Sequence, residues 1–140
     1  MKPKVHRTIR LAAALMLVTA AAGNGQEKTA AIEAGRTALA QGAYEKARTY
    51  FEQQLQETRQ KGDRATESDL LFFLGLTEQQ RAAGFAPADS ERSHLLEESS
   101  QFYTRALELK SALKQPLGPT LNNLGRIYAD LGWNDAARET

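Results

Sequence analysis

The sequence predicts an all-α fold, a right-handed α-solenoid of about three antiparallel helix pairs whose last repeat is incomplete. Two observations carry this prediction. A motif in which a glycine precedes large side chains recurs at Gly35, Gly75 and Gly125. Between these motifs, apolar residues keep helical spacing and glycine or proline interrupts the chain. Recurring helix pairs stack because one pair cannot bury its apolar face alone.

The first 22 residues have the features of a secretory signal peptide. Four basic residues precede an apolar run at Leu11–Ala22, which ends in three alanines. This order predicts cleavage before Gly23 and export to the periplasm or out of a bacterial cell, with membrane contact only through the transient signal peptide. The alternative is an uncleaved anchor. The run is short for that role, because a membrane span needs roughly 20 residues.

Composition excludes some classes of function. The chain has 18 basic and 17 acidic residues. Loss of the four basic residues in the leader leaves 14 against 17, so the remaining chain has no basic excess with which to hold nucleic acid. There is no cysteine, so disulfides cannot contribute and stability must come from helix packing. The remaining residues suffice for one small domain.

The repeat domain is predicted at 27–140, after a short linker at 23–26. Its first unit, about 27–61, has a helix at 27–41 that ends at Gly42, where a turn needs positive φ. A second helix follows at 44–60. The second unit, about 65–113, has helices at 65–83 and 90–113. The loop between these two helices contains Gly84 and Pro87.

The third unit, about 118–140, is predicted to begin with Pro119 in its first helical turn. We expect this helix to end at Gly132 and a last helix to start near Asn134, giving six helices in all. The last helix would have barely two turns. We therefore expect the chain to be a fragment of a longer protein. The alternative is a true terminus that docks on a partner.

The motif resembles that of the tetratricopeptide repeat family, especially the long repeats of kinesin light chain and of bacterial signalling proteins. In that family a small residue on helix A lies against large residues of helix B. Ser99 stands where the family usually has alanine. The residues that carry the resemblance are Gly35, Gly42, Tyr44, Ala47, Phe51, Leu71, Leu74, Gly75, Tyr103, Ala106, Leu121, Leu124, Gly125, Tyr128, Gly132 and Ala137.

The resemblance implies a binding groove, because the A helices of the family line a concave surface that receives a protein or an extended peptide. Helical spacing then gives the partner-binding candidates. Asparagine there could both donate to and accept from a peptide backbone. Alternatively, Asn123 satisfies a neighbouring helix turn. The candidates are Arg36, Phe72, Leu76, Asn122, Asn123 and Arg126.

No pattern indicates catalysis, a metal or a cofactor. His94 precedes Glu97 and Glu98, but a helical metalloprotease motif needs two histidines. There is no cysteine nucleophile, no G-x-S-x-G sequence, no phosphate-binding loop and no evident small-molecule site. A solvated helix face accounts better for His94.

Two hypotheses about function remain. The first is a non-catalytic protein–protein interaction scaffold of the bacterial cell envelope. The second is the N-terminal regulatory repeat region of a larger enzyme or signalling protein, because similar repeats precede CHAT peptidase domains. We also expect weak self-association through Tyr128 and Leu131, since the short last helix leaves part of the third unit's apolar face uncovered.

Overall fold

The computed structural model describes the backbone of residues 29–139 and the side chains of residues 29–132. The predicted signal peptide (1–22) and linker (23–26) lie outside this range. Within it the chain is all-α and contains no strand. The helices are a first helix at 29–40, α2 (Tyr44–Gln60), α3 (Arg64–Ala82), α4 (Ser90–Ala112) and α5 (Gly118–Glu139).

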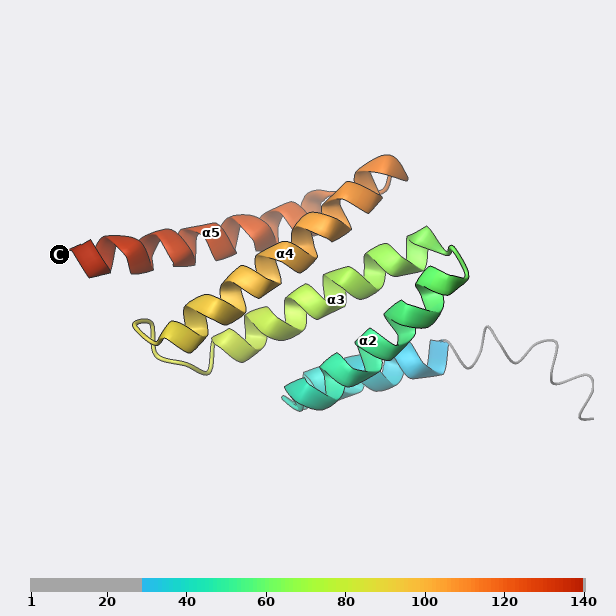
Figure 1. Cartoon of the computed structure of the whole chain (residues 1–140), viewed down its shortest axis with the longest axis horizontal. Coiled ribbons are helices and arrows are strands. Elements are labelled where there is room, and N and C mark those ends of the chain that lie inside the picture. Colours follow the sequence, from blue (N-terminus) through green and yellow to red (C-terminus); the bar gives the residue numbers. More distant parts are fainter. Residues whose placement is uncertain (1–28, 140) are drawn as a thin grey trace, which may run out of the picture.

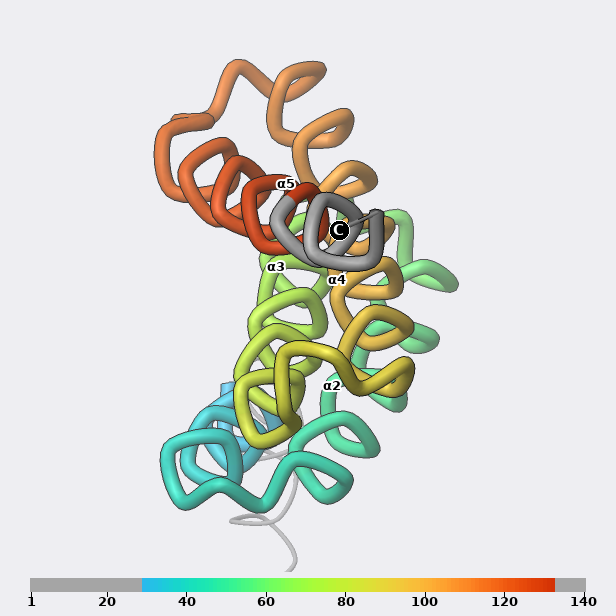
Figure 2. Tube along the Cα trace, turned by 90° about the vertical axis from the view of Figure 1, so that its left-hand side faces the viewer, coloured from blue at the N-terminus to red at the C-terminus, as the bar shows by residue number. Residues whose placement is uncertain are grey.

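The helices form two layers. Each of α2, α3 and α4 packs against the next helix along the chain, as Figure 1 shows. In the end view of Figure 2, the first helix, α3 and α5 lie on one side, while α2 and α4 lie on the other. This is the alternation that a stack of helix pairs requires. The handedness of the stack stays a prediction.

The predicted contacts between small and large residues are present in the first two units. At Gly35, an added Cβ would lie 2.5 Å from the Phe51 ring, and at Gly75 it would lie 2.8 Å from the Tyr103 ring. Only glycine fits at such a distance. Ser99, which replaces the family's alanine, is buried and donates its hydroxyl hydrogen to the Gly75 carbonyl at 2.6 Å. The serine therefore adds a bond between α4 and α3.

Three turns between helices use one hydrogen-bond pattern. Gly42, Gly62 and Lys114 have φ of 73°, 68° and 56°. At each, the N–H of the next residue donates to the carbonyl five positions earlier, with N···O distances of 2.9, 3.2 and 2.8 Å. This Schellman arrangement needs a left-handed residue. Glycine adopts that conformation freely, whereas Lys114 does so at a steric cost.

The apolar core has two buried clusters that meet at α3. The first joins the first helix, α2, α3 and α4, and the second joins α3, α4 and α5. Phe72 and Leu76 are half-buried and pack against both clusters. The core is therefore continuous through the stack, with α3 as its central element.

A charged network also ties the inner helices together. Arg48 on α2 donates to Glu52 at 2.7 Å, to Glu78 on α3 at 2.9 Å and to Glu98 on α4 at 2.7 Å. The Glu78 side chain is fully buried, and its Oε2 has no hydrogen-bond donor among the described residues. Burial raises the pKa of Glu78, outweighing the attraction of Arg48. The carboxylates in turn raise the pKa of Arg48.

The prediction that the third unit turns at Gly132 is wrong, because α5 runs unbroken from Gly118 to Glu139. The described residues therefore contain five helices rather than six. One glycine inside a helix costs only about 1 kcal/mol relative to alanine, and no proline follows Gly132. In this structure, continuing the helix satisfies the backbone hydrogen bonds that a turn would break.

Candidate functional site

A hollow of about 470 Å³ lies where α3, α4 and α5 meet. Its lining combines four apolar side chains with six amide or charged ones. These three helices are also the ones that share the second core cluster. Its lining residues are Leu76, Gln79, Gln80, Ala83, Arg92, Leu96, Asn123, Arg126, Ala129 and Asp130.

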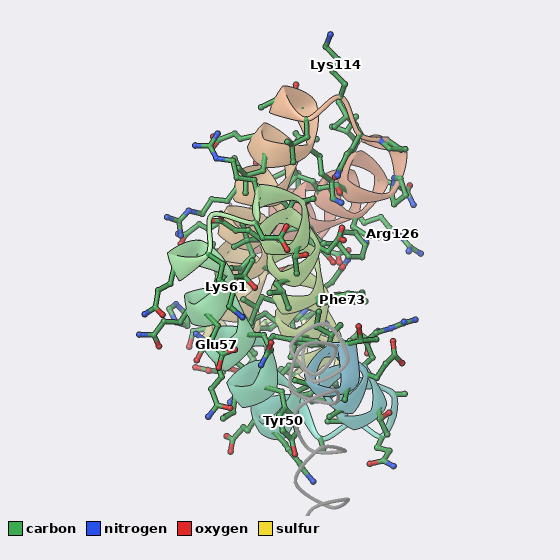
Figure 3. All side chains as sticks on the ribbon, turned by 90° about the vertical axis from the view of Figure 1, so that its right-hand side faces the viewer. Tyr50, Glu57, Lys61, Phe73, Lys114 and Arg126 are labelled. Atoms are coloured by element: carbon green, nitrogen blue, oxygen red, sulfur yellow. The ribbon has the colours of Figure 1, made fainter. Side chains whose placement is uncertain are left out.

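The structure brings three of the six predicted groove residues together. Leu76, Asn123 and Arg126 all line the hollow. Figure 3 shows Arg126 on the same side of the molecule as Phe73, while Glu57 on α2 lies on the other side. The predicted residues that share the hollow thus come from α3 and α5, two helices of one layer.

The other three predicted residues lie elsewhere. Phe72 borders a smaller hollow of about 220 Å³ between α3 and the start of α5, and its ring lies 5.5 Å from the Tyr103 ring. Asn122 is exposed and lines neither hollow. Arg36, on the first helix, forms an ion pair with Glu33 at 2.8 Å and lies over the Phe73 ring. It therefore reaches from the first helix to α3, away from the hollow.

A chain of hydrogen bonds crosses from α5 to α3 through α4. The Asn123 side-chain amide donates to the Tyr103 hydroxyl at 3.3 Å, and that hydroxyl donates to the Gln79 Oε1 at 2.8 Å. Burial raises the pKa of Tyr103, so its hydroxyl keeps its proton. Asn123 therefore bonds a side chain of the neighbouring helix rather than a helix turn. Its carbonyl oxygen accepts no hydrogen bond from the described residues.

Two arginines and one aspartate give the lining of the hollow a net positive charge. Arg92 on α4 donates to the Phe85 carbonyl at 3.3 Å, and its other terminal nitrogen lies 3.9 Å from Asp130. Its Nε is buried and bonds to none of the described residues. Arg126 is exposed and forms no ion pair with any described residue. One arginine is thus partly neutralised, while the other is available to an outside anion.

Sequence reasoning missed two parts of this arrangement. Gln79, Gln80 and Ala83 continue the α3 stripe that begins at Leu76, and helical spacing could have extended the stripe to them. Arg92 comes from α4, a B helix. The resemblance implied a groove lined by A helices alone. No sequence pattern therefore placed an arginine of α4 beside α5.

The described residues offer no grouping of His, Cys, Asp or Glu able to hold a metal ion, and His94 among them is exposed. In the same part of the chain, no helix is long and apolar enough to cross a membrane. The hollow contains amides, guanidinium groups and one carboxylate. Such groups bind by hydrogen bonding and charge.

One comparison with known proteins bears on this arrangement. A family model described as tetratricopeptide repeat matches residues 118–140. The match supports a tetratricopeptide repeat family, whose repeats generally mediate protein–protein interaction. The comparisons with curated proteins and with solved structures gave no match. The matched segment includes Asn123 and Arg126 of the hollow.

Proposed function

We propose that the chain is a non-catalytic interaction module whose hollow between α3 and α5 binds an extended segment of a protein partner. One observation carries this proposal: Arg126 and Asn123 hold unused polar groups in a hollow that Leu76 and Leu96 also line. The hollow's volume of about 470 Å³ falls in the range of ligand pockets, roughly 300–1,000 Å³. The partner is a protein rather than a nucleic acid, because residues 23–140 have 14 basic and 17 acidic side chains.

The lining residues define the chemistry of the bound segment. An apolar side chain fits over Leu76 and Leu96, and the Asn123 carbonyl oxygen accepts a hydrogen bond from a backbone N–H. An acidic side chain next to it pairs with Arg126, whose planar guanidinium suits a carboxylate. We therefore expect a segment that combines an apolar residue with an acidic one.

Selection from a random peptide library tests this function. Peptides that bind the chain should be enriched in acidic and apolar residues. They should lose about tenfold or more in affinity with Arg126→Glu, which reverses the charge, and with Ala129→Arg, which fills the hollow. Arg64→Glu is the matched control, because Arg64 is exposed on α3 outside the hollow. Equal affinity of the selected peptides for Arg126→Glu and for the unaltered chain would contradict the assignment.

We further propose that the protein acts after export. The basic start and the apolar run at Leu11–Ala22 support this location. Mass spectrometry of protein recovered from an exporting bacterial host should show Gly23 as the first residue. A membrane-bound product that retains Met1 would contradict the proposal.

A further inference from the structure

One face of α5 has no counterpart among the described residues. Leu121 is 50% exposed and Tyr128 is 56% exposed. A Cβ added at Gly125 or Gly132 would meet no atom of the described side chains within 4 Å. Leu131, in contrast, packs against the second core cluster. The apolar surface that α5 offers to a partner is therefore a stripe of Leu121, Gly125, Tyr128 and Gly132.

The spacing of this stripe is that of a coiled-coil seam. Its steps of four, three and four residues place the four positions on one side of the helix. Large and small residues alternate along it, in the order leucine, glycine, tyrosine, glycine. Because of this alternation, the large residues of one copy face the small residues of another when the two helices run antiparallel. When the helix is paired with an antiparallel copy of itself, Tyr128 lies opposite Gly125 and Leu121 lies opposite Gly132.

We propose that α5 pairs with α5 of a second copy of this chain, antiparallel about a twofold axis between Arg126 and Ile127. In this arrangement the ring of Tyr128 occupies the space over the partner copy's Gly125. The pairing is isologous, so the same contact forms twice. The inference does not depend on the peptide-binding proposal, because Arg126 and Asp130 of the hollow lie outside the stripe.

The chain already uses this contact twice within itself. Gly35 receives the ring of Phe51, and Gly75 receives the ring of Tyr103. In both cases an aromatic ring covers a helical glycine of the neighbouring helix. Gly125 recurs in the same motif with its space unfilled by any side chain that the structure describes, and Tyr128 is an exposed aromatic ring one turn away. A second copy supplies the missing ring.

The surroundings leave room for a second helix. A depression of about 690 Å³ lies beside Tyr128, and its other lining residues belong to α4. The residues that flank the stripe on its side away from the core, Asn122 and Ala129, carry no charge. No like charges therefore oppose the pairing at these positions. The contact covers about three helical turns, less than a stable dimer usually buries, so we expect a weak dimer with a dissociation constant of roughly 10–500 μM.

Cysteine cross-linking tests the geometry, because the chain has no cysteine of its own. Leu121→Cys and Gly132→Cys variants should form a disulfide-linked heterodimer when mixed and oxidised. Neither should cross-link efficiently alone, since identical positions lie about 16 Å apart along the axis, beyond the reach of a disulfide, whose Cα atoms are usually about 4.4–6.8 Å apart. A parallel pairing would instead link each variant to itself, and that result would overturn the proposal.

Sedimentation velocity over a range of concentrations tests the contact itself. Tyr128→Ser should weaken the dimer by about tenfold or more. Gly125→Leu should also weaken it, because leucine fills the space for the partner copy's ring, while leaving the monomer folded in an open position. The helical circular dichroism of both variants should match that of the unaltered chain. Failure of the unaltered chain to dimerise at about 1 mM, or dimers insensitive to both substitutions, would overturn the proposal.

Discussion

The first two units and the third carry the same glycine motif in different surroundings. Gly35 and Gly75 each lie under an aromatic ring from the following helix, whereas no side chain among residues 29–132 covers Gly125. In the motif, the glycine on helix A leaves space for an aromatic ring that a neighbouring helix supplies. The difference shows that the motif specifies a contact between two helices rather than the conformation of one.

The charged contacts are also closer among the inner helices α2, α3 and α4 than at α5. Arg48 joins α2, α3 and α4 through bonds of 2.9 Å or less. Between α4 and α5 the ion pair of Arg92 with Asp130 is longer, at 3.9 Å. The Asn123–Tyr103 hydrogen bond also joins these two helices. The inner helices are thus fixed by both packing and charge. The stability of α5 depends mainly on one apolar stripe that contains Leu124 and Ile127.

Removing an aromatic side chain should give the largest difference in lost stability between the first two units and the third. Phe51→Ala should cost about 3–5 kcal/mol of unfolding free energy, because Phe51 is fully buried and its loss leaves a cavity. Tyr128→Ala should cost less than about 0.5 kcal/mol in the monomer, since the ring is 56% exposed. Urea denaturation gives both values. Similar losses for the two variants would refute the proposed difference in packing.

Adding a side chain at the glycines should have effects of opposite sign. Gly75→Leu should destabilise the chain by about 1–3 kcal/mol or more, because its Cβ alone approaches Tyr103 to 2.8 Å. Gly125→Leu should stabilise the monomer by about 0.5–1 kcal/mol, since leucine favours the helix and meets no neighbour. Thermal unfolding at low protein concentration measures both. A stable Gly75→Leu variant would refute the contact with Tyr103.

The stability of the inner helices should depend on pH through Glu78. Its pKa is raised in the folded chain by burial, so the folded state holds the proton more tightly than the unfolded state does. The contribution of Glu78 to stability is therefore greatest below the unfolded pKa, and it declines as pH rises through the folded pKa.

Urea midpoints of the unaltered chain and of Glu78→Gln, measured from about pH 4 to 8, test this direction. The stability of the unaltered chain relative to Glu78→Gln should fall as pH increases. Glu57→Gln, at an exposed position of α2, controls for the loss of one carboxylate. A difference that grows with pH would show that Arg48 outweighs burial.

The turn before α5 should yield a small gain in stability when its left-handed residue is replaced. Lys114 has φ of 56° where the turns at Gly42 and Gly62 use glycine. Lys114→Gly should therefore stabilise the chain by about 1 kcal/mol, because glycine adopts the left-handed conformation without steric cost. Lys61→Gly is the control, since Lys61 ends α2 in the right-handed region. Differential scanning calorimetry gives the comparison, and a loss of stability at Lys114→Gly would contradict the steric argument.

The sequence was sufficient to predict the helices of the first two units, because their glycine turns and apolar spacing are local signals. It also indicated the Gly75–Tyr103 contact through the repeated motif. It failed at Gly132, where the prediction of a turn relied on analogy with Gly42. A turn of this kind depends on the packing of the following helix, which no single residue encodes.

The candidate site was predicted in part for a similar reason. Helical spacing placed Asn123 and Arg126 on one side of α5, and it placed Leu76 on the matching side of α3. The distance between two helices is not a local property, however. Spacing therefore could not show that Arg92 of α4 approaches Asp130, or that Arg36 lies over Phe73 of α3 and outside the hollow. Those contacts depend on how neighbouring helices cross.

Amide hydrogen exchange on the dilute, monomeric chain tests the central claim most directly: the first two units are closed and the third is open. Exchange should be slowest where α3 and α4 bury Leu74 and Tyr103, and it should be much faster across Leu121–Gly132. Protection across Leu121–Gly132 equal to that of α3 would contradict the account, because it would show that the uncovered face of α5 does not weaken the helix.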